Sequence, residues 1–180
     1  MLDAIIKNDC LEVNYTNAQE KTSNLTLSPY VIKQFDLKWY LVAHDTTKGK
    51  EYKTKVYALD SINSIEFTNK PYVRDEQFNA DQYFKYSIGV WHFHNQDPIE
   101  VELEFNDPTM FQDILNNPIH HSQKCIIQNQ YHLIISIKVY ESIELLYKIR
   151  KYGSATKILS PSSLADTIKN DAKGVIRLYE

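Results

Sequence analysis

One run of seven residues constrains the fold of this chain more tightly than any other segment. The apolar residues Ile99, Val101, Leu103 and Phe105 alternate with three glutamates. Because successive side chains of a β-strand point to opposite faces, this run predicts a strand with one buried face and one acidic, solvated face. It is the clearest strand in the sequence, and it fixes the interpretation of the second half of the chain.

The segments after this strand follow a familiar order. Asp107 and Pro108 predict the start of a helix, because aspartate caps helices and proline suits the first helical position. Gly153 marks the end of a second helix. The predicted helix, two strands, helix, strand and final helix cover residues 107–116, 122–128, 131–139, 142–151, 156–159 and 160–178. The order β-α-β-β-α-β with a terminal helix predicts a ferredoxin-like domain.

The first 70 residues contain short strands instead. Leu2, Ile5 and Ile6 share one helical face and predict a short opening helix. The strands predicted after it cover residues 11–15, 25–35, 39–44, 54–59 and 62–67. Pro29 predicts a bulge or an edge position in the second of them. So many strands in so short a segment fit a small, bent barrel of the SH3 or Sm type, since closure removes exposed edges.

We therefore expect an α+β chain of three parts. The 180 residues are enough for one large domain or two small ones. The parts are a barrel over 1–70, a linker with a short helix over 71–97, and a ferredoxin-like domain over 98–180.

Composition excludes several classes of protein. The formal net charge of −3 is not that of a strongly basic nucleic-acid-binding domain. Cys10 and Cys125 do not make a disulfide framework, which favours a reducing cytoplasm. The sequence has no signal-peptide pattern at Met1 and no run of 18 apolar residues, so we expect neither secretion nor a membrane span.

The motifs of common enzyme classes are also missing. The four glycines are scattered, and neither a G-x-S-x-G nor an H-E-x-x-H motif occurs. His121 and Ser122 are neighbours on a predicted strand and would point to opposite faces, which argues against a dyad. His92 and His94 share a face, but no third metal ligand follows at a recognisable spacing. We expect a protein that is not an enzyme and that holds no metal or cofactor.

Several motifs resemble, in order, those of the WYL family. Trp39-Tyr40-Leu41 matches the tripeptide that names the family, residues 27–35 are similar to its PY-x-L-K strand, and residues 57–62 to its F-x-L-D-R-I motif. Residues 83–84 and 88–90 are similar to the linker of WYL proteins from Bacteroidetes-type bacteria, and residues 118–123, 144–146, 152–153 and 159–161 are similar to their C-terminal extension, the WCX type. The resemblance covers nearly the whole chain.

This resemblance implies a fold and a role. WYL domains resemble Sm-like barrels, usually follow a winged helix-turn-helix, and bind an anionic ligand such as a nucleotide or single-stranded nucleic acid. Their C-terminal extension is ferredoxin-like and contributes to dimer contacts. The resemblance implies the effector-binding part of a bacterial transcription regulator, homodimeric, which reaches DNA only through a winged helix that this chain lacks, either as a truncated chain or as a stand-alone protein.

The resemblance also points to an anion site. The first-strand tyrosine of the family falls at Tyr15, its arginines fall at Lys55 and Ser61, and an intermediate position that is often basic falls at Ala58. Guanidinium binds phosphate in bidentate fashion whereas lysine is a point charge, so the missing arginines weaken the expectation of tight oligonucleotide binding. Three further lysines could restore positive charge nearby: Lys33, Lys38 and Lys53.

The remaining candidate ligand residues are polar or aromatic: Tyr40, His44, Tyr57, His120, His121, Ser122 and Gln123. The last four suit a ligand edge, or equally a loop that hydrogen-bonds its own backbone. The lysines could be solvated surface residues, and Tyr15 a half-buried strand aromatic. Trp39 and Leu41 are expected to share one strand face as barrel core, with Tyr40 on the other.

Two functions from different classes therefore stay open. The first is the sensing of an anionic, nucleotide-like effector. The second is a dimerisation or protein-interaction module without a ligand, which explains the missing arginines at least as well.

Overall fold

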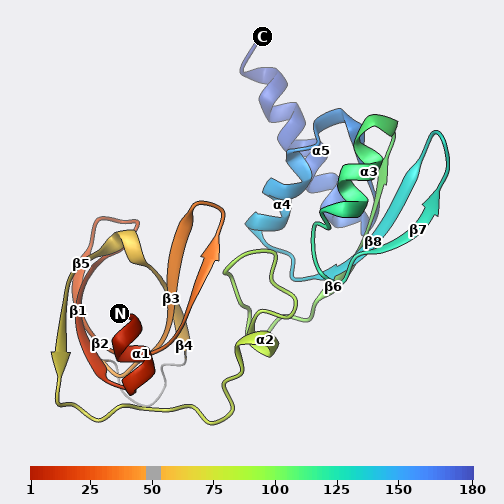
Figure 1. Cartoon of the computed structure of the whole chain (residues 1–180). Coiled ribbons are helices and arrows are strands. Elements are labelled where there is room, and N and C mark those ends of the chain that lie inside the picture. Colours follow the sequence, from red (N-terminus) through yellow and green to blue (C-terminus); the bar gives the residue numbers. More distant parts are fainter. Residues whose placement is uncertain (48–53) are drawn as a thin grey trace. The chain divides into compact units, whose positions relative to one another are not determined.

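A computed structural model of the chain describes residues 1–47 and 54–180 and shows an α+β fold with two antiparallel sheets (Figure 1). The chain divides into two compact units, Met1–Tyr83 and Phe84–Glu180, each with its own sheet and core. The general α+β prediction is confirmed. Within the described residues, no helix is long and apolar enough to cross a membrane.

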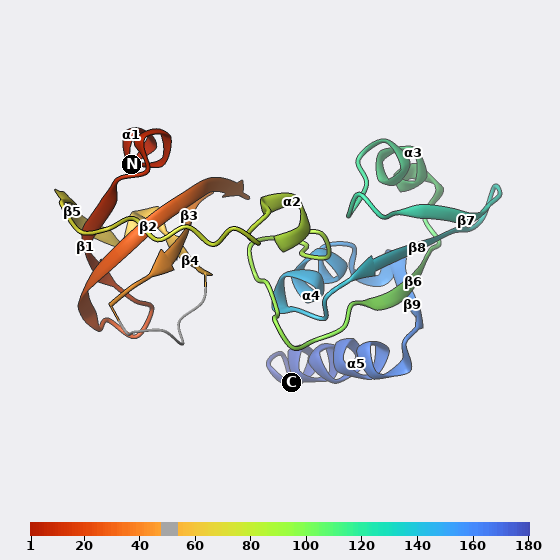
Figure 2. The same cartoon turned by 90° about the horizontal axis from the view of Figure 1, so that it is seen from below.

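The first unit contains helix α1 (Leu2–Lys7) and one curved sheet, with α1 lying across one end of it (Figure 2). Its strands, in the order β4-β3-β2-β1-β5, are β1 (Cys10–Thr16), β2 (Thr22–Phe35), β3 (Lys38–Asp45), β4 (Thr54–Ala58) and β5 (Ile62–Thr68). The short helix and the strands are where the sequence predicts them. The predicted closed barrel is not confirmed, because in the described part of the chain the edge strands β4 and β5 do not pair with each other.

Strand β2 is long enough to serve two neighbours. Residues 22–27 pair with β1, and residues 27–35 pair with β3. The register with β3 shifts between Pro29 and Val31, which confirms the predicted bulge. Proline has no N–H to donate to a sheet ladder, so a bulge is a favoured place for it. The shift sets which residues of β2 and β3 lie opposite each other beyond this point.

The core of the first unit lies on the concave face of the sheet. Its fully buried side chains are Ala4, Leu11, Leu27, Leu41 and Ala43. Trp39 is 49% exposed, so the prediction that it belongs to the core with Leu41 is wrong. Trp39 lies opposite Gln34 near the tip of the β2–β3 hairpin, where there is little structure to cover an indole.

The segment after β5 packs back onto β2. Tyr72 donates its hydroxyl to the Pro29 carbonyl at 2.8 Å, and the Val73 N–H donates to Ser28 Oγ at 2.9 Å. The sequence predicts the short helix of the linker over 79–86, but helix α2 (Ala80–Tyr83) has only four residues. Tyr83 donates its hydroxyl to the Thr54 carbonyl of β4 at 3.4 Å.

The second unit contains one sheet, in the order β7-β8-β6-β9, and three helices longer than a single turn. Along the chain its elements are β6 (Ile99–Phe105), α3 (Pro108–Asn116), β7 (Lys124–Gln128), β8 (Leu133–Val139), α4 (Ile143–Arg150), β9 (Thr156–Ser160) and α5 (Ser162–Arg177). They follow the predicted succession, and β8 separates β6 from β7 in the sheet. The sequence also predicts that Ser160 caps the final helix, but Ser160 ends β9 and α5 begins at Ser162, so this prediction is wrong.

The alternating strand β6 lies in the middle of this sheet. Val101, Leu103 and Phe105 are fully buried among side chains of α3, α4 and α5, and Ile99 is partly buried at the start of the strand, on the face that the alternation predicts. Its glutamates are partly covered: Glu104 pairs with His132 at 2.8 Å, and Glu100 accepts a hydrogen bond from Ser136 at 3.2 Å. The prediction of a fully solvated acidic face is therefore too simple, because neighbouring strands supply polar partners that sequence alternation does not reveal.

Candidate functional site

Lys33 and Tyr40 lie directly opposite each other on β2 and β3, and Ala58 of β4 lies opposite Tyr40. Residues opposite each other in an antiparallel sheet place their side chains on the same face. All three side chains are half-buried. The sheet thus places an ammonium group beside a phenol ring on a partly accessible face, and we call Lys33 and Tyr40 the outer pair.

Lys38 lies on the same face as the outer pair, opposite Phe35. Its ammonium lies 2.9 Å from the Asp60 carboxylate, and this hydrogen bond and charge raise the pKa of Lys38. Asp60 and Ser61 belong to a 3-10 turn, Leu59–Ser61, that packs against β3. The structure therefore brings Lys38 and Ser61 near the outer pair, with Asp60 compensating the charge of Lys38.

Three other predicted residues, Tyr15, Lys55 and Tyr57, lie on the opposite, inner face of the sheet. The rings of Tyr15 and Tyr57 meet edge to face with centroids 5.4 Å apart. The Tyr57 hydroxyl donates to the buried Asp45 carboxylate at 3.3 Å. Burial, followed by the charge and hydrogen bond of Asp45, raises the pKa of Tyr57. Lys55 lies opposite Ala43 on this face.

The predicted site residues are thus divided between two faces of one sheet. Of the inner residues, Tyr57 contacts Asp45, whose carboxylate accepts the Tyr57 hydroxyl and also the Thr47 N–H at 2.9 Å. A buried acid next to the phenol disfavours a second anion there. The outer pair is the better place for an anionic ligand.

His44 lies on the outer face, opposite Ser28 and Thr54. Its Nδ1 is buried and has no hydrogen-bond partner among the described residues. Tyr40, Val42 and His44 are alternate residues of β3, so their side chains lie on the same face of the sheet. Lys53 lies outside the described residues. The sequence also predicts a hairpin loop over 46–51, and residues 48–51 of it lie outside the described residues too.

Three of the four predicted residues of the second unit, His120, Ser122 and Gln123, hydrogen-bond the protein's own backbone. Gln123 accepts the Ile119 N–H and donates to the Ile114 carbonyl, both at 2.9 Å. Ser122 accepts the Lys138 N–H at 2.8 Å and meets His120 Nδ1 at 2.8 Å. The ring of His121, which is exposed, lies 4.0 Å from that of His120. These contacts join the end of α3 to β8. They agree with the second interpretation given above, a loop that hydrogen-bonds its own backbone.

A polar hollow that the sequence analysis missed lies within the first unit, on the outer face of β1, β2 and β5. Its volume is about 390 Å³. The residues that line it are Glu12, Val13, Asn14, Asn24, Leu25, Thr26, Thr47, Ser64, Glu66 and Lys70. The sequence signal for this hollow was the polar residues that alternate with apolar ones in β1 and β2. Only the pairing register of the two strands shows that these polar residues lie side by side.

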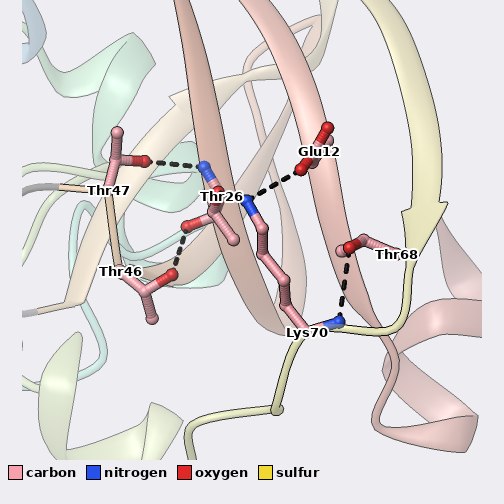
Figure 3. A network of polar contacts seen from close by, with 6 residues as sticks. All are labelled: Glu12, Thr26, Thr46, Thr47, Thr68 and Lys70. Atoms are coloured by element: carbon pink, nitrogen blue, oxygen red, sulfur yellow. Dashed lines mark hydrogen bonds and ion pairs between the residues drawn. The ribbon is translucent and has the colours of Figure 1, made fainter.

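Both signs of charge meet in this hollow (Figure 3). Lys70 Nζ lies 2.8 Å from the Glu12 carboxylate and donates to Thr26 Oγ1 at 3.2 Å. Thr46 and Thr47 bind the backbone of Thr26, with the Thr26 N–H donating to Thr47 Oγ1 at 2.6 Å and Thr46 Oγ1 donating to the Thr26 carbonyl at 3.0 Å. The polar groups of the hollow thus bind one another. Its two glutamates, Glu12 and Glu66, lie opposite each other and disfavour the binding of an anion.

Two histidines of the second unit lie close together. His92 and His94 have ring centroids 4.6 Å apart. Among the residues that the structure describes, no group of three or more His, Cys, Asp or Glu side chains is placed to hold a metal ion.

Comparison with known proteins identifies the first unit. A family model described as WYL domain matches residues 1–67. No curated protein matches the chain. A solved structure titled as a CRISPR Cas-related protein is similar to 99% of this chain and 49% of its own, with 15% identity and a TM-score of 0.59. Proteasome accessory factor B/C (PafBC) of Arthrobacter aurescens is similar over 99% of this chain and 26% of its own, with 15% identity and a TM-score of 0.39.

The chain spans half or less of the length of these two structures. The CRISPR Cas-related protein shares the fold at low identity over nearly all of the present chain. The match over residues 1–67 coincides with the sheet that carries the Trp39-Tyr40-Leu41 motif. Residues 1–67 therefore form a WYL domain.

Proposed function

We propose that this protein is the effector-binding part of a transcription regulator and that its WYL domain binds a nucleotide-like or single-stranded nucleic-acid anion. The observation that carries the proposal is the outer pair. A lysine ammonium attracts phosphate as a point charge, and an adjacent phenol ring offers a face on which a base can stack. In this proposal the bound state is passed to a DNA-binding domain outside these 180 residues.

The outer pair supports a moderate affinity and not a tight one. One lysine opposite one tyrosine supplies a single phosphate contact and a single stacking surface. Lys38 adds little positive charge because Asp60 is paired with it. A short ligand with one or two phosphates matches this set better than a long strand, which would need a row of cations.

The proposal extends to the two folds and to the assembly. The curved sheet of the first unit is proposed to be an Sm-like barrel that is open between β4 and β5. The order β7-β8-β6-β9, with every neighbouring pair antiparallel, agrees with a ferredoxin-like domain, which we propose to contribute to a homodimer. In the cytoplasm such a protein would bind its effector without catalysing a reaction.

Titration of the whole chain tests this function. Fluorescently labelled ADP and a labelled (dT)12 strand are added at several salt concentrations, and anisotropy reports binding. We expect saturable binding that weakens with salt. Lys33→Ala should weaken it about tenfold and lower the salt slope by about 1.

The matched control is Lys21→Ala, which removes an exposed lysine from the turn between β1 and β2. It should bind as the parent chain does. If neither probe binds saturably, or if Lys33→Ala and Lys21→Ala behave alike, the outer pair is not the ligand site.

A second function, a protein-interaction module without a ligand, is favoured by β5. This strand is at one edge of the sheet, and its Ile65 and Phe67 side chains are 38% and 61% exposed. Exposed edge strands with apolar side chains invite pairing with another chain. If light scattering shows a dimer that Phe67→Lys dissociates while no anion binds, the interaction module is the better account.

A further inference from the structure

The loop before β6 in the second unit is fixed by a buried carboxylate. Glu144, in the first turn of α4, is 6% exposed. Its Oε1 accepts the Val90 N–H at 2.8 Å, and its Oε2 accepts the Trp91 N–H at 3.4 Å. Ser87 donates its hydroxyl to the Trp91 carbonyl at 2.7 Å. The backbone of Trp91 is therefore held at both its N–H and its C=O.

Trp91 presents its indole to solvent from this fixed backbone. The residue is 58% exposed. An indole offers a large apolar surface whose burial would stabilise the fold, so its exposure is not explained by packing within the unit. A fixed backbone with an exposed aromatic ring is an arrangement that suits recognition, because the loop does not have to be ordered on binding.

Further aromatic rings surround this loop. The ring centroid of Tyr140 in β8's C-terminal extension lies 5.8 Å from Tyr86, 5.8 Å from His92 and 5.6 Å from Phe93. Those three rings all come from the loop itself. Tyr140 itself is buried, and the three rings around it are half-buried. Trp91 directly precedes His92 and Phe93 in the loop.

Two lysines converge on the same group. The ammonium groups of Lys85 and Lys138 lie 5.3 Å and 5.8 Å from the centroid of the Tyr86 ring. Both residues are exposed, and they come from separate segments of the unit. We call Lys85, Tyr86, Trp91 and Lys138 the aromatic-basic surface, and the buried Tyr140 packs against Tyr86.

The charge near this surface also includes a carboxylate, Asp97. Burial, then the neighbouring Tyr86 and the charge of Asp97, raise the pKa of Tyr140. A phosphate would be repelled by Asp97 and attracted by the two ammonium groups at Tyr86. Rings flanked at one end by cations match a ligand that has a flat base and a phosphate.

We propose that the aromatic-basic surface is a second binding site, for a nucleobase that carries a phosphate. The base stacks on the exposed Trp91 indole and the phosphate lies at Lys85 and Lys138. Free nucleotides and single-stranded nucleic acid share this chemistry. The site is separate from the outer pair, since all of its residues belong to the second unit.

The two tryptophans of the chain allow the two sites to be tested apart, because Trp39 belongs to the first unit and Trp91 to the second. In the whole chain with Trp39→Phe, tryptophan emission reports Trp91 alone. ADP, a (dT)12 strand and inorganic phosphate are titrated separately. We expect ADP or (dT)12 to quench Trp91 saturably and inorganic phosphate to leave its emission unchanged. Tighter binding of ADP identifies a free nucleotide as the ligand class, and tighter binding of (dT)12 identifies a strand.

Exchange of both lysines then tests the phosphate contact. Lys85→Ala with Lys138→Ala should weaken quenching at least tenfold, whereas Lys124→Ala, which removes an exposed lysine from β7 of the same unit, should leave it unchanged. The proposal is overturned if neither base-bearing probe quenches Trp91, if inorganic phosphate quenches it equally, or if the double variant matches Lys124→Ala.

The reciprocal chain separates this inference from the proposed function. With Trp91→Phe, emission reports Trp39 beside the outer pair. Quenching of Trp39 without quenching of Trp91 overturns the second site and supports the first. Quenching of Trp91 without quenching of Trp39, together with unchanged binding by Lys33→Ala, supports the second site and contradicts the outer pair.

Discussion

Replacement of Glu144 by alanine should destabilise the second unit more than any exposed acid in it. The short bond from the Val90 N–H to a buried carboxylate is charge-assisted and contributes about 1.5–3 kcal/mol. The contact with the Trp91 N–H, at 3.4 Å, adds little. A carboxylate in the first turn of a helix adds about 0.3–1 kcal/mol through the helix dipole. We therefore expect a loss of about 2–4 kcal/mol in the free energy of unfolding.

Urea unfolding measures this loss. The chain with Trp39→Phe is unfolded while Trp91 emission is followed, so that the signal comes from the second unit. Glu144→Gln keeps one acceptor oxygen and loses the charge, so it should lie between the parent chain and Glu144→Ala. The control is Glu141→Ala, an exposed acid three residues away, which should change stability by less than about 0.5 kcal/mol.

Two results would refute the reasoning. The first is a Glu144→Ala chain whose free energy of unfolding lies within about 0.5 kcal/mol of the parent's. The second is an equal loss in Glu141→Ala. Either result would mean that the buried carboxylate does not hold the loop and that Trp91 is not presented on a fixed backbone.

Two further predictions concern pH and the loop after α3. Burial raises the pKa of Tyr83 to about 12, so the folded chain keeps that proton where the unfolded chain releases it, and stability should fall as pH rises from about 10 to 12. Tyr83→Phe should flatten this fall in urea titrations at successive pH values, and an unchanged slope would contradict it. Gln123→Ala leaves the Ile119 N–H and Ile114 carbonyl without their partner and should cost about 1–3 kcal/mol without changing ligand affinity. Loss of affinity at unchanged stability would instead make His120 to Gln123 a ligand edge.

The local signals of the sequence predicted local structure well. The alternation at Ile99 to Phe105 gave the central strand of the second sheet, and Asp107 with Pro108 gave the start of α3, where Asp107 accepts the Thr109 N–H. Pro29 gave the bulge in β2. These features depend on side-chain direction and on backbone donors within a few residues.

What the sequence did not predict depends on partners distant along the chain. Tyr57 is not available to an anionic ligand because its hydroxyl binds Asp45 of the neighbouring strand. No spacing rule in the sequence predicts this hydrogen bond. The loop backbone at Val90 is held by Glu144, which is 54 residues away. Trp39 was expected in the core because strand alternation gives the face of a residue, whereas its position near a hairpin tip decides whether anything covers that face.

The most direct test of the central proposal is the affinity of the whole chain for labelled ADP before and after Lys33→Ala, measured at two salt concentrations. The outer pair predicts saturable binding that weakens about tenfold in Lys33→Ala, with a salt slope smaller by about 1, while Lys21→Ala binds as the parent does. Equal affinity and equal salt slope in all three chains would contradict the account.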